Sequence, residues 1–181
     1  MNNIKAVSDE LQYDWAVMPD AHFASTVILC NELLPTLNKF YSGNLFPDLG
    51  LFGDHPSYEL FKPIIYNMRH AIELYLKYFA RTIDKDLFQA THNYPCLKGA
   101  IMHHFDKNEL WGKALPIMDK YYFGNYADMN LDVGDLKNTR ERYPNKNSVG
   151  IKLSSANVEE VKQDAIDLQK ILREIKIKLL T

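Results

Sequence analysis

The hydrophobic residues of this chain recur at intervals of three and four, which is the spacing of one face of an α-helix. The clearest case lies between positions 57 and 82, where apolar side chains gather on one side of the helix and ionisable ones on the other. The apolar set is Ile64, Ile65, Met68, Ile72, Tyr75, Leu76 and Phe79, and the ionisable set is Arg69, His70, Glu73, Lys77 and Arg81. The pattern predicts a long amphipathic helix with a core face and a charged face.

The same spacing predicts further helices on both sides of this segment. They are expected over 21–41, 96–105 and 108–122, and prolines inside the first and last should bend or shorten them. A final helix should begin at the N-cap Asn157, with Glu160 placed to reach back to the cap. Its apolar residues form a heptad-like seam of Val158, Val161, Ala165, Leu168, Leu172, Ile175 and Leu179. The seam fits either the core of an antiparallel bundle or a helix of a second chain.

Two stretches, 42–55 and 132–150, read as loops because they carry glycine, proline and polar residues. No segment alternates apolar and polar residues in the manner of a strand, and no internal repeat is visible. The sequence therefore predicts an all-α fold, an antiparallel helical bundle of about five helices.

Length and composition add limits to this picture. The 181 residues suit one domain over 1–181, and 46% hydrophobic residues exclude a disordered chain. A net charge of -2 gives no global positive field, so contact with nucleic acid needs a local patch. Neither a signal peptide nor a membrane-spanning run is visible, and Cys30 and Cys96 lack a CxxC arrangement. We expect a cytoplasmic protein with free thiols and no membrane association.

Three ionisable residues of the central helix form a charge ladder, by which we mean Arg69, Glu73 and Lys77. They stand four residues apart, so both cations can pair with the central carboxylate. The charge ladder fits a solvated helix face, where each pair contributes about 0.3 to 0.5 kcal/mol, or a recognition surface. His70 beside it could move a proton in cleavage at an RNA 2′-hydroxyl. His70 and Arg69 diverge by about a hundred degrees, however, and do not easily converge on one phosphate.

A second basic cluster lies in the predicted loop at 132–150. Arg140 and Arg142 could bind phosphate bidentately, and Tyr143 could stack a base. Alternatively, Arg142 pairs with Glu73 or another buried carboxylate while Tyr143 fixes the loop to the bundle, and this structural alternative is slightly favoured.

Histidine and cysteine also raise the question of a metal site. His92, Cys96, His103 and His104 are all possible zinc ligands. Pro95 separates the first two, and adjacent histidines on a helix point apart, so no metal is expected. No phosphate loop, dinucleotide turn or nucleophile elbow occurs, and no cofactor is expected.

Three motifs follow one another along the chain. They are Arg69-His70-Ala71-Ile72-Glu73-Leu74-Tyr75-Leu76-Lys77, then Thr91-His92, then Arg140-Glu141-Arg142-Tyr143-Pro144-Asn145 with a glycine close behind. Their order and spacing resemble a group of bacterial HEPN-like (higher eukaryote and prokaryote nucleotide-binding) proteins. In that group an Arg-His-x-x-Glu-x-x-x-Lys helix precedes a His-containing loop, a variable helix, an Arg-Tyr-Pro segment and a long final helix. The resemblance begins near Tyr58 and covers the N-terminal helix and loop at 1–57 only weakly.

The resemblance implies an antiparallel, often dimeric bundle whose relatives bind nucleotides or RNA, many of them in antiviral defence or toxin–antitoxin systems. It places ligand binding on Arg69, Glu73, Lys77, Arg140, Arg142 and Tyr143. Catalytic relatives use an Arg followed, after four to six residues, by a His, and this chain has no such pair. We therefore expect a non-catalytic nucleotide- or RNA-binding homodimer.

Two alternatives remain open. One is a metal-independent ribonuclease with a rearranged site, in which His70 or His92 acts with an arginine of the segment 140–142. The other is a structural or regulatory bundle that binds a protein partner through the heptad-like seam, with the charge ladder as solvated charge only.

Overall fold

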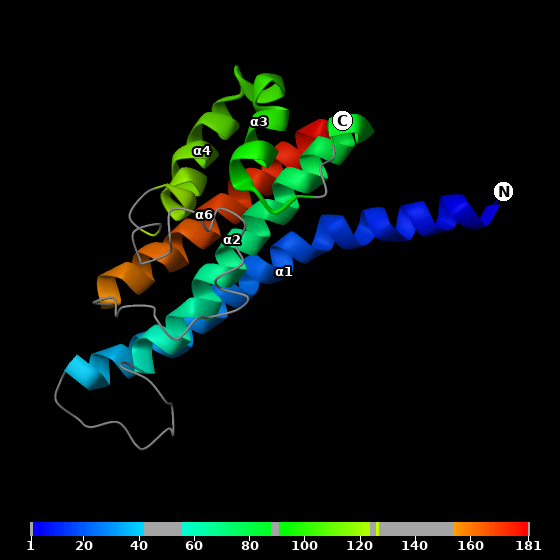
Figure 1. The fold of residues 1–181 in the computed structure, drawn as a ribbon. Helices are drawn as coiled ribbons and strands as arrows, with labels where there is room; N and C mark the ends of the chain where they lie inside the picture. Colours follow the sequence, from blue (N-terminus) through cyan, green and yellow to red (C-terminus); the bar gives the residue numbers. More distant parts are fainter. Residues whose placement is uncertain (1, 42–55, 88–90, 124–125, 127–153, 181) are drawn as a thin grey trace.

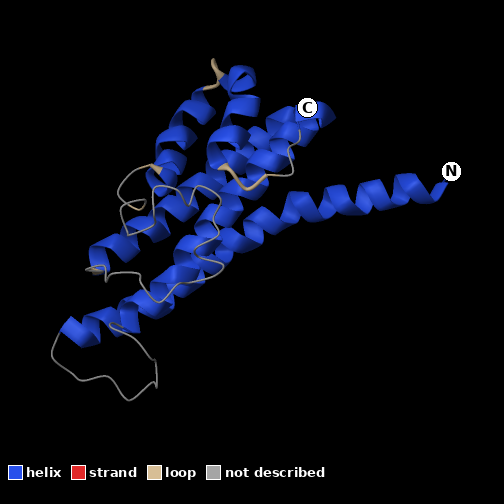
Figure 2. Cartoon of the chain, in the orientation of Figure 1, coloured by secondary structure: helices blue, strands red, loops and turns tan. Residues whose placement is uncertain are grey.

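The computed structural model describes residues 2–41, 56–87, 91–123, 126 and 154–180. Figure 1 traces the elements along the chain, and Figure 2 shows that the described residues form helices and short loops, with no strand among them. The elements are α1 (Asn2–Tyr41), α2 (Pro56–Ile83), the 3-10 helix η1 (Lys85–Leu87), α3 (Tyr94–Phe105), α4 (Glu109–Tyr122) and α6 (Ser155–Leu180). The predicted all-α bundle is confirmed.

The central helix of the bundle is α2, which packs against α1, η1, α3, α4 and α6. Two contacts fix the direction of α6 relative to α1. Ser155 Oγ lies 2.8 Å from Asn38 Oδ1 at one end, and Arg173 Nε lies 2.9 Å from Asp20 Oδ2 at the other. The two helices are therefore antiparallel, and the N-terminal part of α1 runs past the end of this contact and away from the other helices (Figure 1).

The heptad-like seam of α6 belongs to the core of this chain. Its first six members are buried, with Leu168 and Leu172 at 0% exposure, and Leu179 at the end of the helix is partly buried. They pack with apolar residues of α1, α2, α3 and α4 in one hydrophobic cluster. Of the two interpretations of the seam, the intramolecular one is therefore correct.

Two helices, α1 and α6, begin at residues other than those predicted. Helix α1 begins at Asn2 and not near Ala21, and it continues through Pro19 and Pro35 without ending. Helix α6 begins at Ser155, so Asn157 lies inside it and the predicted N-cap is wrong. Ser154 takes that role, because its Oγ accepts a hydrogen bond from Asn157 N at 3.2 Å.

Glu160 does not reach back to a cap and instead joins α6 to α4. Its Oε1 lies 2.7 Å from Lys120 Nζ, and its Oε2 accepts a hydrogen bond from Tyr126 Oη at 2.6 Å. The hydrogen bonds from Lys120 and Tyr126 hold the pKa of Glu160 below its usual value. The predicted capping box does not form, because the residue three positions after the cap Ser154 is Asn157, whose Oδ1 accepts a hydrogen bond from Ser154 N at 3.1 Å.

The starts of α3 and α4 follow the expected chemistry more closely. Asn93 caps α3, its Oδ1 accepting a hydrogen bond from Cys96 N, and Pro95 occupies the first turn, where its missing N–H is tolerated. Asn108 caps α4 in the same way through Leu110 N. Within the described part of the chain, no helix combines the length and the hydropathy that crossing a membrane requires.

The two cysteines are free thiols with different surroundings, Cys30 buried and Cys96 exposed. Burial raises the pKa of the Cys30 thiol to about 12, and only the thiolate reacts readily. We therefore expect iodoacetamide to modify Cys96 alone in the native protein at about pH 8, and both cysteines after unfolding. Intact-mass measurement over time checks this, and equal labelling rates in the native protein would show that α1 opens readily.

Candidate functional site

The charge ladder of α2 is buried, contrary to the interpretation of a solvated helix face. Arg69, Glu73 and Lys77 are exposed by only 2%, 2% and 5%. The ladder occupies successive turns of α2, the helix that every other described element contacts. Because buried charges cost several kcal/mol unless they are paired, the partners of these three side chains decide what the site can do.

Arg69 is fixed to α4 through the backbone and one aromatic ring. Its Nε donates a hydrogen bond to Tyr121 O at 2.9 Å, and its guanidinium carbon lies 5.4 Å from the centroid of the Tyr122 ring. Tyr122 Oη in turn donates a hydrogen bond to Arg69 O at 2.9 Å. These contacts give Arg69 a clear structural role in joining α2 to α4.

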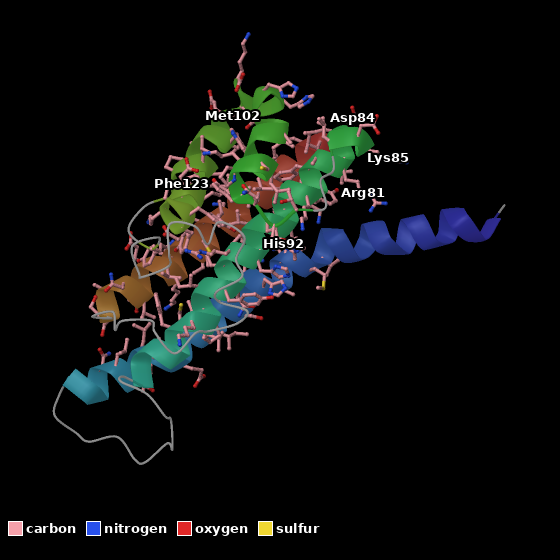
Figure 3. All side chains as sticks on the ribbon, in the orientation of Figure 1. Arg81, Asp84, Lys85, His92, Met102 and Phe123 are labelled. Carbon is pink, nitrogen blue, oxygen red and sulfur yellow. The ribbon has the colours of Figure 1, made fainter. Side chains whose placement is uncertain are left out.

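Glu73 is the centre of a second group of contacts. Its Oε1 lies 2.7 Å from Lys77 Nζ and 2.8 Å from Nδ1 of His92, which belongs to the segment before α3 (Figure 3). His70 Nδ1 lies 4.0 Å from the other carboxylate oxygen, Oε2. We call Glu73, Lys77, His70 and His92 the Glu73 cluster.

The Glu73 cluster connects the interior with the surface through its histidines. The His92 side chain is 42% exposed and that of His70 is 14% exposed, whereas Glu73 is almost fully buried. Since a carboxylate oxygen only accepts, His92 Nδ1 carries the proton, and its Nε2 is the acceptor of the neutral ring. A histidine held in this way by a carboxylate is the arrangement that orients a general base.

One oxygen of the Glu73 cluster lacks a hydrogen-bond donor. No described residue donates to Glu73 Oε2, although this atom is buried. A buried acceptor without a donor costs about 1 to 3 kcal/mol. The geometry therefore leaves one buried acceptor of the cluster without a donor among the described residues.

Sequence reasoning missed the neighbours of His70 on α1 and α2. Asn67 Nδ2 donates to Pro63 O at 2.8 Å, which turns Oδ1 toward His22 Nδ1 at 2.7 Å. His22 Nδ1 therefore carries the proton, as His92 Nδ1 does. The His22 ring meets the His70 ring edge-on at 4.5 Å, and His70 stacks on Tyr66 at 5.4 Å. A lone histidine in an apolar run of α1 was the only local signal for this contact.

The remaining sequence-predicted residues lie outside the described part of the chain. They are Arg140, Arg142 and Tyr143, together with the proposed pairing of Arg142 with Glu73. His103 and His104 are exposed on α3, and their ring centroids lie 3.8 Å apart, so the expectation that the two side chains point apart is wrong. Among the described residues, no group of three or more His, Cys, Asp or Glu side chains is arranged to hold a metal ion.

Comparison of the whole chain with models of protein families, with curated proteins and with solved structures gave no match. The three quoted motifs are thus the only link to the HEPN-like group, and the function has to be argued from them and from the Glu73 cluster.

Proposed function

We propose that this protein is a HEPN-like module that binds a nucleotide or RNA as a homodimer, with a role in defence or toxin–antitoxin systems. The observation that carries the proposal is the burial of the charge ladder together with two histidines from different elements on Glu73. A buried carboxylate that holds a surface histidine is an arrangement found in binding and catalytic sites. The resemblance of the Arg-His-x-x-Glu-x-x-x-Lys helix supplies the class of ligand.

The chemistry of the surface edge of the site suits a nucleotide. The imidazole of His92 offers a flat ring and an acceptor nitrogen at the surface, and rings of this kind stack on unpaired bases. Arg140 and Arg142, which stand three residues and one residue before Tyr143, supply the guanidinium groups that phosphate binding needs. The overall charge of -2 makes such local contacts necessary.

Binding of labelled ATP and of a labelled oligouridylate, followed by fluorescence anisotropy at two salt concentrations, tests the proposal. We expect His92→Ala to weaken binding about tenfold. Arg140→Ala and Arg142→Ala should each reduce the slope of log K against log salt concentration by about one. His104→Ala, an exposed histidine of α3, is the matched control and should bind normally. Absence of binding to both ligands at low salt would contradict the proposal.

A second candidate, metal-independent cleavage of RNA, is favoured by the hydrogen bond between His92 and Glu73. In this reaction His92 Nε2 takes the 2′-hydroxyl proton, and the 2′-oxygen bonds to the adjacent phosphorus while the bond to the 5′-oxygen breaks. The leaving 5′-oxygen receives a proton from an acid such as protonated His70, which gives a cyclic phosphate and a 5′-hydroxyl.

Electrophoresis of intact RNA after incubation with the protein tests this candidate. If it is correct, His92→Ala should reduce the cleavage rate by about a hundredfold or more, and His104→Ala should leave it unchanged. Cleavage that persists in the double variant His70→Ala, His92→Ala would assign the activity to another site or to a contaminant.

A further inference from the structure

The open acceptor position of Glu73 limits what kind of ligand group the site can take. Its Oε2 is buried and accepts no hydrogen bond from a described residue, while Oε1 is already engaged by Lys77 and His92. An anionic phosphate oxygen cannot donate a hydrogen bond and is repelled by a carboxylate. A ligand group that approaches Oε2 must therefore carry a donor.

The tautomers of the surrounding histidines also favour a ligand group that donates hydrogen bonds. His22 and His92 both hold their protons on Nδ1, because Asn67 Oδ1 and Glu73 Oε1 are acceptors. In the neutral rings each Nε2 is thus an acceptor as well. Together with Glu73 Oε2, the polar groups of this region match hydrogen-bond donors better than they match phosphate.

The positive charge of Lys77 does not reverse this preference. Its ammonium lies 2.7 Å from Glu73 Oε1, and its side chain is only 6% exposed. Arg69 is engaged by Tyr121 O and lies over Tyr122. The cations of the charge ladder are therefore committed within the protein, and phosphate recognition is left to other residues.

Inside an RNA chain, the sugar carries one hydroxyl that is free to donate, because both the 3′- and the 5′-oxygens are esterified. This 2′-hydroxyl also distinguishes RNA from DNA, and in dinucleotide-binding folds a carboxylate accepts its hydrogen bond. We infer that Glu73 Oε2 accepts a hydrogen bond from a ribose 2′-hydroxyl, so that the Glu73 cluster selects RNA over DNA. The inference rests on the proposed function and names the part of the ligand that this site reads.

Entry of the ribose takes place beside His92. That side chain is the most exposed member of the Glu73 cluster, at 42%, and a shift of its ring exchanges its 2.8 Å contact with Glu73 Oε1 for the contact of the ribose. The 2′-hydroxyl then donates to Glu73 Oε2, and it can accept from a protonated His70, whose Nδ1 is 4.0 Å from the same oxygen. Both contacts disappear when the hydroxyl is absent.

Three oligonucleotides of the same length and base test the inference on the unmodified protein. They are oligouridylate, oligodeoxyuridylate and 2′-O-methyl oligouridylate, each measured by anisotropy. We expect the first to bind at least about tenfold more tightly than the other two, since a hydrogen bond to a charged group is lost. The methylated strand keeps an RNA-like sugar shape but cannot donate a hydrogen bond. Weak binding of this strand would therefore show that hydrogen-bond donation, and not sugar shape, determines the affinity.

The outcomes for the ribose contact and for the proposed function are distinguishable. Equal affinity for all three strands overturns the ribose contact and leaves the RNA-binding proposal standing. Binding of none of them contradicts the proposed function itself. Tight binding of the methylated strand and weak binding of DNA also overturns the contact, because shape and not donation would then decide.

A variant ties the selectivity to Glu73. Glu73→Gln should reduce the ratio of RNA affinity to DNA affinity to near one, and His104→Ala should keep the wild-type ratio. If Glu73→Gln does not fold, the double variant Glu73→Gln, Lys77→Met removes the charge left behind by the first change. An unchanged ratio in a folded variant would assign the selectivity to other residues and overturn the inference.

Discussion

Simultaneous substitution of Leu168→Glu and Leu172→Glu is expected to unfold the protein. Both side chains have 0% exposure and lie in the core shared by α6 and the other helices. Each change loses about 1.5 to 3 kcal/mol of apolar burial and places a carboxylate inside the hydrophobic cluster. The burial lost at the two positions and the several kcal/mol that each buried carboxylate costs together match the whole stability of a typical domain, about 5 to 15 kcal/mol. Far-UV circular dichroism should show loss of most of the helix signal.

The same helix provides the control for this experiment. Ile166 and Ile177 are 42% and 62% exposed, so Ile166→Glu and Ile177→Glu should each change the free energy of unfolding by less than about 0.5 kcal/mol. If the Leu168→Glu, Leu172→Glu protein instead kept its helicity and only lost self-association, the seam would be an interface between chains and the assignment to the core would fail.

The helix boundaries show what a hydrophobic pattern can and cannot predict. The limits of α2, α3 and α4 agree with expectation to within two residues, because each has a regular apolar stripe, and α3 and α4 also have an asparagine before them. The start of α6 was misplaced because two candidate caps, Ser154 and Asn157, lie three residues apart. In the structure these two residues bond to each other, Asn157 N donating to Ser154 Oγ and Ser154 N donating to Asn157 Oδ1, so both carry cap-like chemistry and the sequence alone does not order them.

Burial of the charge ladder could not be predicted from periodicity. A periodic pattern sorts residues by polarity, and by that criterion Arg69, Glu73 and Lys77 belong to the outer face of a helix. Their burial follows from long-range contacts: Tyr121 O accepts from Arg69, and His92 reaches Glu73 across 19 positions of sequence. Nothing near these residues in the sequence specifies either partner.

The identity of the site residues was therefore more predictable than their surroundings. The Arg-His-x-x-Glu-x-x-x-Lys motif coincides with the turns of α2 that carry the buried charge ladder, and His92, which was named with it, contacts Glu73. His22 and Asn67 were missed because they lie 45 residues apart and each is unremarkable in its own segment. The RNA-binding hypothesis therefore rests on two kinds of observation. The charge ladder was visible in the sequence, whereas the acceptors around it are visible only in the packed structure.

Glu73→Ala is expected to lower the free energy of unfolding by about 3 to 5 kcal/mol, because it removes the carboxylate that neutralises a buried ammonium. Lys77 Nζ is 2.7 Å from Glu73 Oε1 and only 6% of its side chain is exposed. The same change also releases His92, which loses the acceptor for its Nδ1 proton. Urea unfolding followed by circular dichroism gives the difference, and the midpoint should fall without a change in slope.

An ion pair of the same spacing on α6 is the matched control. Glu174 and Lys178 also stand four residues apart, with Nζ to Oε1 at 3.2 Å, but their side chains are 49% and 60% exposed. Glu174→Ala should therefore cost less than about 1 kcal/mol. Adding Lys77→Met to Glu73→Ala should recover part of the lost stability, because the uncompensated charge is removed as well. Equal effects of Glu73→Ala and Glu174→Ala would mean that the Glu73 carboxylate is hydrated in solution, and both the buried cluster and the ribose contact built on it would then be wrong.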